Sequence, residues 1–197
     1  KALDDILTYK YGFKTKTLID EDATRDQIID TLDYYIDTLI SNDNLLIYFA
    51  GHGKLDIGDD KASYWLPFDA KYDSKSRWIS NLELSSRIKS LKSKHVLVIA
   101  DSCYAGAQDR GSIDYLQSED AKTYFKRILS KQSRKLLASG GEEPVMDSGG
   151  GKHSVFAKAL LDILEENNSY LETYSLFGKL RPKVINNSPQ TPEYEII

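Results

Sequence analysis

The distribution of apolar and polar positions along the chain predicts alternating helices and strands. Three short apolar runs, at residues 45–50, 96–100 and 135–139, predict strands buried on both faces, as in a parallel sheet. Two further strands are predicted at 15–19 and at 64–67, where a proline ends the segment, and the chain ends in an extended segment at 194–197.

Helices are predicted where apolar residues recur three or four positions apart, because that spacing forms one stripe on a helix. One such helix covers about residues 25–40, with Thr24 as its N-cap and Gln27 three residues later, as in a capping box. The other predicted helices cover residues 1–10, 81–91, 119–130, 154–164 and 173–184. This alternation favours an α/β domain, with a mostly parallel sheet and helices on both faces.

The polar and glycine-rich segments between these elements are predicted to be loops. Residues 54–61 are charged, residues 107–118 are polar and irregular, and residues 140–152 are rich in glycine. The length of 197 residues favours a single domain over residues 1–197, and the sequence contains no internal repeat.

Two short motifs directly follow apolar strands. Gly51-His52-Gly53 comes after the strand at 45–50, and Asp101-Ser102-Cys103 comes after the strand at 96–100. In open α/β sheets the ligand crevice lies outside the carboxyl ends of the strands, so both motifs are expected at the same edge. The glycines on either side of His52 leave room for a bound peptide backbone.

An imidazole beside a thiol can carry out nucleophilic catalysis. A thiol with a pKa near 8.5 becomes a better nucleophile when a histidine takes its proton, and the same histidine can protonate the leaving amine. We therefore predict that His52 and Cys103 are catalytic, with the backbone N–H groups of Gly53 and Cys103 as oxyanion donors. The alternative for a lone cysteine is a small buried apolar residue, and one cysteine excludes an intrachain disulfide or a cysteine-rich metal site.

The segments around His52 and Cys103 resemble those of the caspase and metacaspase peptidases. Residues 48–53 (Tyr-Phe-Ala-Gly-His-Gly) are followed by residues 101–106 (Asp-Ser-Cys-Tyr-Ala-Gly), with Cys103 51 positions after His52, close to the caspase spacing of about 50. Four further segments, 65–69, 137–141, 153–156 and 190–194, are similar to bacterial caspase-like domains. The resemblance implies a caspase-like fold, a large-subunit-like region at about 1–118 and a small-subunit-like region at about 119–197.

The resemblance also implies a preference for basic substrates. Metacaspases have an aspartate two residues before the nucleophile and cleave after Arg or Lys, and Asp101 occupies that position. A carboxylate there would pair with a cationic side chain, bidentately with arginine. Ser139, Gly140 and Asp147 are expected near the substrate groove on the same grounds. The alternatives are a structural turn residue for Asp101 and a solvated loop residue for Asp147.

The beginning of the chain departs from the caspase pattern. Caspase-like domains start with a central strand and a helix that would precede Lys1, and this sequence contains neither. Removing a central strand would expose unpaired backbone groups, so we expect the missing N-terminal segment to exist as a partner, on a cleaved chain or outside this sequence. It often carries another acidic pocket residue. Self-cleavage within 107–134 is a further expectation if the enzyme prefers basic residues.

Charge and composition limit the other partners and cofactors. With 26 Lys and Arg against 30 Asp and Glu, the net charge is -4, and no basic run suited to nucleic acid is present. The apolar runs are far shorter than the roughly 20 residues that span a bilayer, so a cytoplasmic protein without membrane contact is expected. No organic cofactor is expected. Some metacaspases require calcium, and Asp56, Asp59 and Asp60 could bind it, but a solvated loop is the default.

The two remaining histidines are weaker candidates for chemistry. His95 precedes its strand, so it is expected at the opposite end of the sheet from Cys103, and His153 is expected to cap or pack against a helix. No histidine spacing indicates a metal site.

Two other interpretations compete with an endopeptidase. One is an inactive caspase-like module that serves in interaction or regulation, against which the presence of both His52 and Cys103 counts. The other is a hydrolase of non-peptide amides. The resemblance also implies a regulated role in bacterial defence or cell death, with a sensor or regulatory domain as partner.

Overall fold

The computed structural model describes residues 1–56, 62–102, 129–140 and 153–197. The helices, in chain order, are α1 (Ala2–Tyr9), α2 (Arg25–Thr38), α3 (Asn81–Ser90), α5 (Val155–Glu166) and α6 (Thr173–Ile185). The strands are β1 (Asn44–Ala50), β2 (His52–Leu55), β3 (Ser63–Leu66), β4 (Ile79–Ser80), β5 (His95–Asp101), β6 (Ser133–Ala138) and β7 (Glu193–Ile196).

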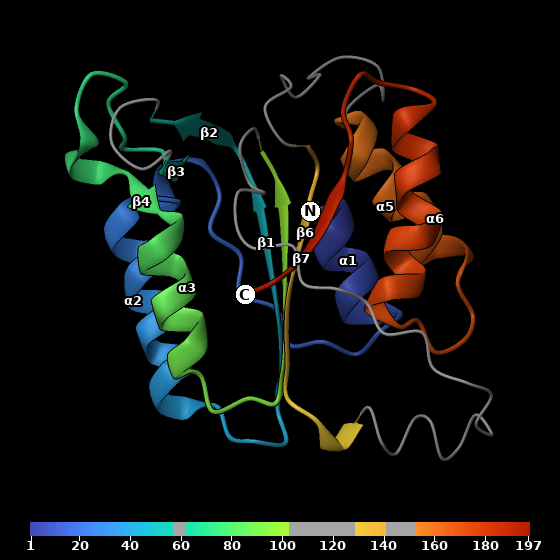
Figure 1. Cartoon of the computed structure of the whole chain (residues 1–197). Helices are drawn as coiled ribbons and strands as arrows, with labels where there is room; N and C mark the ends of the chain where they lie inside the picture. The colour runs from blue at the N-terminus through green and yellow to red at the C-terminus, as the bar shows by residue number, and fades with distance from the viewer. Residues whose placement is uncertain (57–61, 103–128, 141–152) are drawn as a thin grey trace.

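The main sheet has the strand order β1-β5-β6-β7 and divides the molecule into two helical layers (Figure 1). β1, β5 and β6 run parallel, and β7 is antiparallel to β6. Helices α2 and α3 lie on one side of this sheet, and α1, α5 and α6 lie on the other (Figure 1). The prediction of a mostly parallel sheet with helices on both faces is confirmed.

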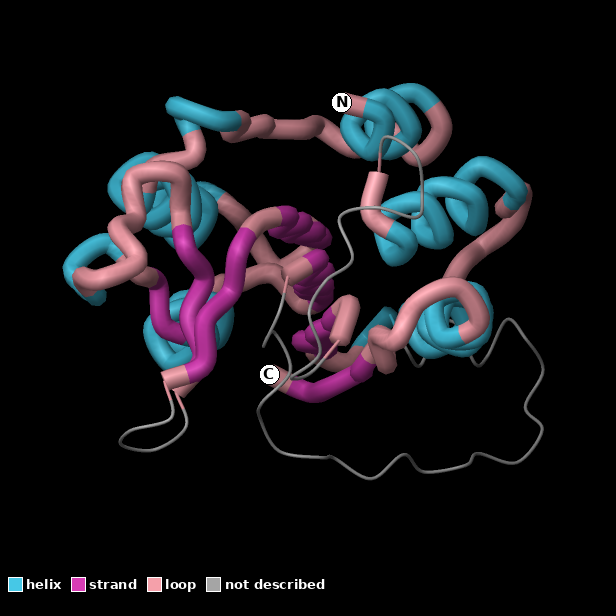
Figure 2. The backbone as a smooth tube through the Cα atoms, turned by 90° about the horizontal axis from the view of Figure 1, so that it is seen from above, coloured by secondary structure: helices cyan, strands magenta, loops and turns pink. Residues whose placement is uncertain are grey.

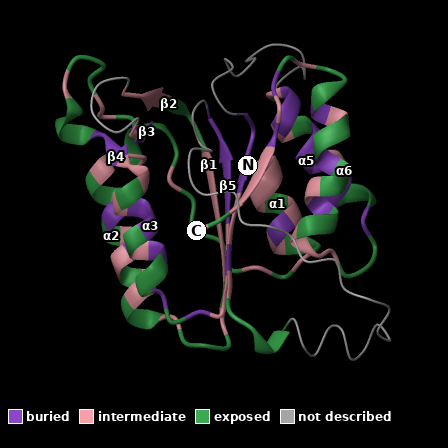
Figure 3. Ribbon diagram, in the orientation of Figure 1, coloured by how far each residue is buried: buried purple, intermediate pink, exposed green. Residues whose placement is uncertain are grey.

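The central strand β5 supplies side chains to a core on each side. Val98 and Ala100 belong to the cluster under α2 and α3, whereas Ile99 packs with Phe156 of α5 in the opposite cluster. All four are at most 1% exposed, and Figure 3 shows buried residues on the helix faces turned toward the sheet. Because successive side chains of a strand point to opposite faces, a continuous apolar run is needed here. β1 is less buried than predicted, since its inner residues are half-buried.

A second, smaller sheet was not predicted. β2, β3 and β4 form an antiparallel sheet that lies next to α2 and α3 (Figures 1 and 2). The predicted loop at 54–61 is wrong at its start, because Lys54 and Leu55 pair with Tyr64 and Ser63 of β3. These strands have only two to four residues, too few for a clear apolar pattern.

The predicted strand at 15–19 is also wrong. Four of its five residues are exposed, and none of the strands in the described ranges pairs with it. An extended segment becomes a strand only through ladder hydrogen bonds to a neighbour. The helix predicted at 25–40 is confirmed with its cap, since the Thr24 hydroxyl accepts a hydrogen bond from the Gln27 N–H at 3.3 Å. Most of the helix predicted at 119–130 lies outside the described residues.

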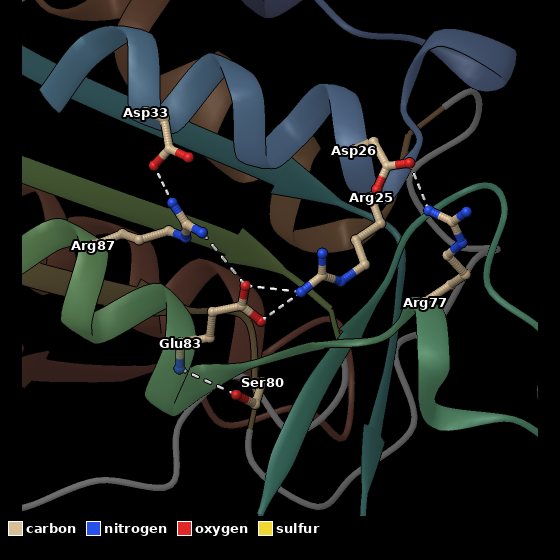
Figure 4. A network of polar contacts seen from close by, with 7 residues as sticks. All are labelled: Arg25, Asp26, Asp33, Arg77, Ser80, Glu83 and Arg87. Atoms are coloured by element: carbon tan, nitrogen blue, oxygen red, sulfur yellow. Dashed lines mark hydrogen bonds and ion pairs between the residues drawn. The ribbon is translucent and has the colours of Figure 1, made fainter. Parts of the chain in front are cut away.

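Ion pairs join the two helices on one side of the main sheet (Figure 4). Glu83 of α3 pairs with Arg25 of α2 at 2.8 Å and with Arg87 one turn later at 3.7 Å. Arg87 also pairs with Asp33 of α2. These side chains are partly exposed, so each pair contributes little alone, and their common partner Glu83 links them into one network.

Candidate active site

His52 lies at the surface and is separated from the carboxyl end of β1 by Gly51. It is exposed and begins β2, where it pairs with Leu66 of β3. Gly53, the predicted oxyanion donor, follows it in β2 and pairs with Trp65. His52 is therefore accessible to solvent near the carboxyl end of β1.

The strands that precede the two predicted catalytic residues are adjacent and parallel. Ala50, the last residue of β1, is in register with Asp101, the last residue of β5. The Gly51 N–H extends this ladder by donating to the Asp101 carbonyl at 3.3 Å. Cys103 itself lies outside the described residues, as does Asp147, so the register fixes only the strand ends from which His52 and Cys103 continue.

Asp101 is a buried carboxylate held by two hydroxyl groups. The residue is 6% exposed, and its Oδ2 accepts hydrogen bonds from Ser154 at 2.5 Å and from Tyr48 at 3.4 Å. Burial is the main cause that raises the pKa of Tyr48, and the charge of Asp101 and its hydrogen bond with Tyr48 raise it further. The phenol is therefore a hydrogen-bond donor at neutral pH. The carboxylate thus connects β1, β5 and the start of α5.

Ser139 and Gly140 lie at the same edge of the sheet, just beyond β6. The Ser139 N–H donates to the Ala100 carbonyl at 2.9 Å, and its hydroxyl donates to the Ser102 carbonyl at 3.3 Å. Both residues are buried. Because the Ser139 hydroxyl is directed at the β5 end, only the backbone of this segment is left to contribute to a groove.

Tyr48 and Ser154 were missed as partners of Asp101. Ser154 caps α5, since its hydroxyl accepts from the Ala157 N–H at 2.9 Å, and the preference for serine at the N-cap was an available signal. His153 was expected to cap this helix or to pack against it. The cap is Ser154 instead, and His153 is exposed, which argues against packing.

The other predicted polar positions are His95 and the aspartates at 56, 59 and 60. His95 begins β5, at the end of the strand opposite Asp101, as expected. Asp56 forms an ion pair with Lys75, whereas Asp59 and Asp60 lie outside the described residues. Within the described ranges no group of three or more His, Cys, Asp and Glu side chains is arranged to hold a metal ion. None of the helices described there has the length and apolar character needed to cross a membrane.

Comparison with known proteins identifies a matching family and a solved structure of similar fold. The family model described as the caspase domain matches residues 1–196. Among solved structures, protein GSU0716 from Geobacter sulfurreducens is similar with a TM-score of 0.66 and 18% identity, over 98% of this chain and 82% of that one. At this identity the likeness concerns the fold alone. No curated protein sequence matches the chain.

Proposed function

The chain belongs to the caspase domain family of cysteine peptidases, and we propose that it is a cysteine endopeptidase in which His52 and Cys103 cleave the peptide bond. The observation that carries this proposal is the register of Ala50 with Asp101 on adjacent parallel strands. Neighbouring strands lie about 4.8 Å apart, and His52 and Cys103 each come two residues after this pair. The strand ends that precede the two residues therefore lie side by side at the same edge of the sheet.

The proposed reaction proceeds through an acyl-enzyme. His52 takes the proton of the Cys103 thiol, and the thiolate attacks the substrate carbonyl to form a tetrahedral oxyanion. The backbone N–H groups of Gly53 and Cys103 donate to this oxyanion. His52 then returns the proton to the leaving amine as the C–N bond breaks. Water, deprotonated by His52, hydrolyses the remaining thioester and restores the thiol.

We further propose that the enzyme cleaves after Arg or Lys, with Asp101 as the acceptor of the cationic side chain. Support comes from the burial of this carboxylate and from the Tyr48 and Ser154 hydroxyls that orient it. A fixed carboxylate shielded from water attracts a cation more strongly than one in solvent. Ser139, Gly140 and Asp147 would border the bound peptide.

Matched fluorogenic peptides test both parts of this proposal. Peptides that end in Arg, Lys or Asp should be compared on wild type, Cys103→Ala and His52→Ala, with the thermal midpoint of each variant measured as a folding control. We expect cleavage after Arg and Lys, and its loss in both variants. Cleavage after Asp would refute the assigned specificity. Absence of both cleavage and labelling by an arginyl chloromethylketone would instead support an inactive interaction module.

The biological setting stays a prediction from the family resemblance. A cytoplasmic peptidase with protein substrates is proposed, without nucleic acid or membrane partners and without an organic cofactor or required calcium. An N-terminal segment that completes the sheet, a sensor or regulatory domain that restrains the enzyme, and a role in bacterial defence or cell death also remain predictions. Activity assays with EDTA and with added calcium would test the metal requirement directly.

A further inference from the structure

A single residue, Gly51, separates β1 of the main sheet from β2 of the smaller sheet. β1 ends at Ala50 and β2 begins at His52, so the chain passes from one sheet to the other within a single residue. The Gly51 N–H is bonded to the main sheet through the Asp101 carbonyl, and the next residue already pairs with Leu66 of β3. The position of His52 therefore depends on how closely the Gly51 backbone approaches the side chains that pack against it.

The ring of Phe49 lies directly against Gly51. A Cβ atom added to Gly51 would be 2.9 Å from Cζ of this ring, 3.4 Å from Cε1 and 3.5 Å from Cε2. Carbon atoms at van der Waals contact are about 3.5 to 4.0 Å apart, so a methyl group does not fit unless the ring or the backbone moves.

Trp65 restricts any movement of the Phe49 ring. The two rings are stacked, with centroids 4.2 Å apart and an interplanar angle of 2°. Trp65 is only 3% exposed, belongs to the core cluster under α2 and α3, and pairs with Gly53 in the β2–β3 ladder. The stack thus adjoins the two glycines that flank His52, and it is anchored in a packed core that yields little.

We propose that the Phe49–Trp65 stack is a positioning element that sets the location of His52 relative to the β5 end. The two aromatic residues touch neither the substrate nor the reacting atoms in this role, and they act through the backbone of Gly51 and Gly53. The inference rests on the proposed function of His52. It adds a reason for the glycine before the histidine: the backbone must lie on the ring of Phe49.

The variant Gly51→Ala tests this proposal. The added methyl group pushes the backbone away from the ring and displaces His52, so kcat/KM should fall about 100-fold, the size of effect that a misplacement of 1 Å produces. The rate of Cys103 alkylation by iodoacetamide should be measured from pH 5 to 9. The proposed pair predicts that Cys103 is alkylated faster in wild type than in His52→Ala, and Gly51→Ala should lose this advantage.

Two further variants separate displacement from general damage. In Phe49→Leu the ring that meets the added methyl group is gone, so adding Gly51→Ala to this variant should lower kcat/KM and the alkylation rate far less than Gly51→Ala lowers them in wild type. Gly178→Ala is the matched control, because a Cβ there meets nothing within 4 Å, and its activity should equal that of wild type. Thermal midpoints show which variants are folded at the assay temperature.

Each outcome decides a separate question. Wild-type kcat/KM in folded Gly51→Ala, or an equal fall in kcat/KM when Gly51→Ala is added to wild type and to Phe49→Leu, overturns the positioning role. If Gly51→Ala does not fold, Phe49→Leu alone decides: an unchanged kcat/KM and an unchanged alkylation profile overturn the proposal, and a loss of both supports it. Alkylation in wild type that His52→Ala leaves unaltered would refute the catalytic pair itself.

Discussion

At the scale of single residues, the environment of Tyr48 shows how a buried hydroxyl links the site to the stability of the protein. Its phenol donates to Asp101, a buried carboxylate, and its ring packs against the cluster that contains Ile99. Ionising this phenol would place a second negative charge beside the carboxylate. The folded state therefore favours the protonated phenol more strongly than the unfolded state does.

This preference predicts a pH dependence of stability. Burial and Asp101 raise the pKa of Tyr48 above its ordinary value of 10.0, so its stabilising contribution is complete below about pH 10 and is lost as the pH rises further. Tyr48→Phe has no proton to lose at this position. We expect the free energy of unfolding, measured in urea at pH 8 and pH 10.5, to fall less in Tyr48→Phe than in wild type. An equal fall in both would contradict the assigned cause.

The residue scale also shows what the sequence could predict of the site. The location of His52 and Asp101 at the sheet edge was predictable because each stands next to an apolar strand, and strand ends have a known place in α/β sheets, whereas the pocket role of Asp101 is implied by the family resemblance. Tyr48 and Ser154 each lie 53 positions from Asp101, so only the folded chain reveals their contact. The local sequence around a hydroxyl group in a strand or at a helix cap does not indicate which distant residue it contacts.

At the scale of elements, the end of α3 depends on a side chain from β6. Arg134 is 8% exposed, and its guanidinium donates to the carbonyls of Ile88 at 3.0 Å, Leu91 at 2.6 Å and Ser93 at 3.4 Å. Carbonyls at a helix end lack intrahelical partners and carry partial negative charge. Burial lowers the pKa of Arg134, which remains charged at neutral pH.

Replacing this side chain should loosen the junction of α3 and β6. Arg134→Met preserves much of the apolar length but leaves the three carbonyls without these donors, and we expect a loss of about 3 kcal/mol in the free energy of unfolding. Lys131→Met, at an exposed position just before β6, is the control and should change stability by less than about 0.5 kcal/mol. Urea denaturation of both variants measures the difference, and equal stability would show that water replaces the guanidinium.

Elements differed in how well the sequence specified them. α2 and α5 were predictable because each has a long apolar stripe and a capping hydroxyl, and β5 because a strand buried on both faces needs an unbroken apolar run. β2 and β4 were not, because their few residues form strands only through β3. The segment 15–19 has the composition of a strand but lacks a partner among the described strands.

At the scale of the whole molecule, β5 holds two cores together. The cluster under α2 and α3 contains Val98 and Trp65, and the cluster against α5 and α6 contains Ile99 and Phe156. Because both clusters use side chains of the same strand, damage to one core should be felt in the other. If residues 1–197 form a single domain, as predicted, a mutation in one core should destabilise both, and this coupling can be measured.

The two tryptophans of the chain allow that measurement, since both report on one side of the sheet. Trp65 lies in the cluster under α2 and α3, and Trp78 contacts Tyr64 of β3. Ile99→Ala removes side-chain volume from the opposite cluster and should cost about 2 to 5 kcal/mol. In one cooperative domain this loss shifts the unfolding midpoint from tryptophan fluorescence by the same amount as the midpoint from far-ultraviolet circular dichroism. A fluorescence midpoint that stays at the wild-type value while the dichroism midpoint falls would mean that the two cores unfold independently.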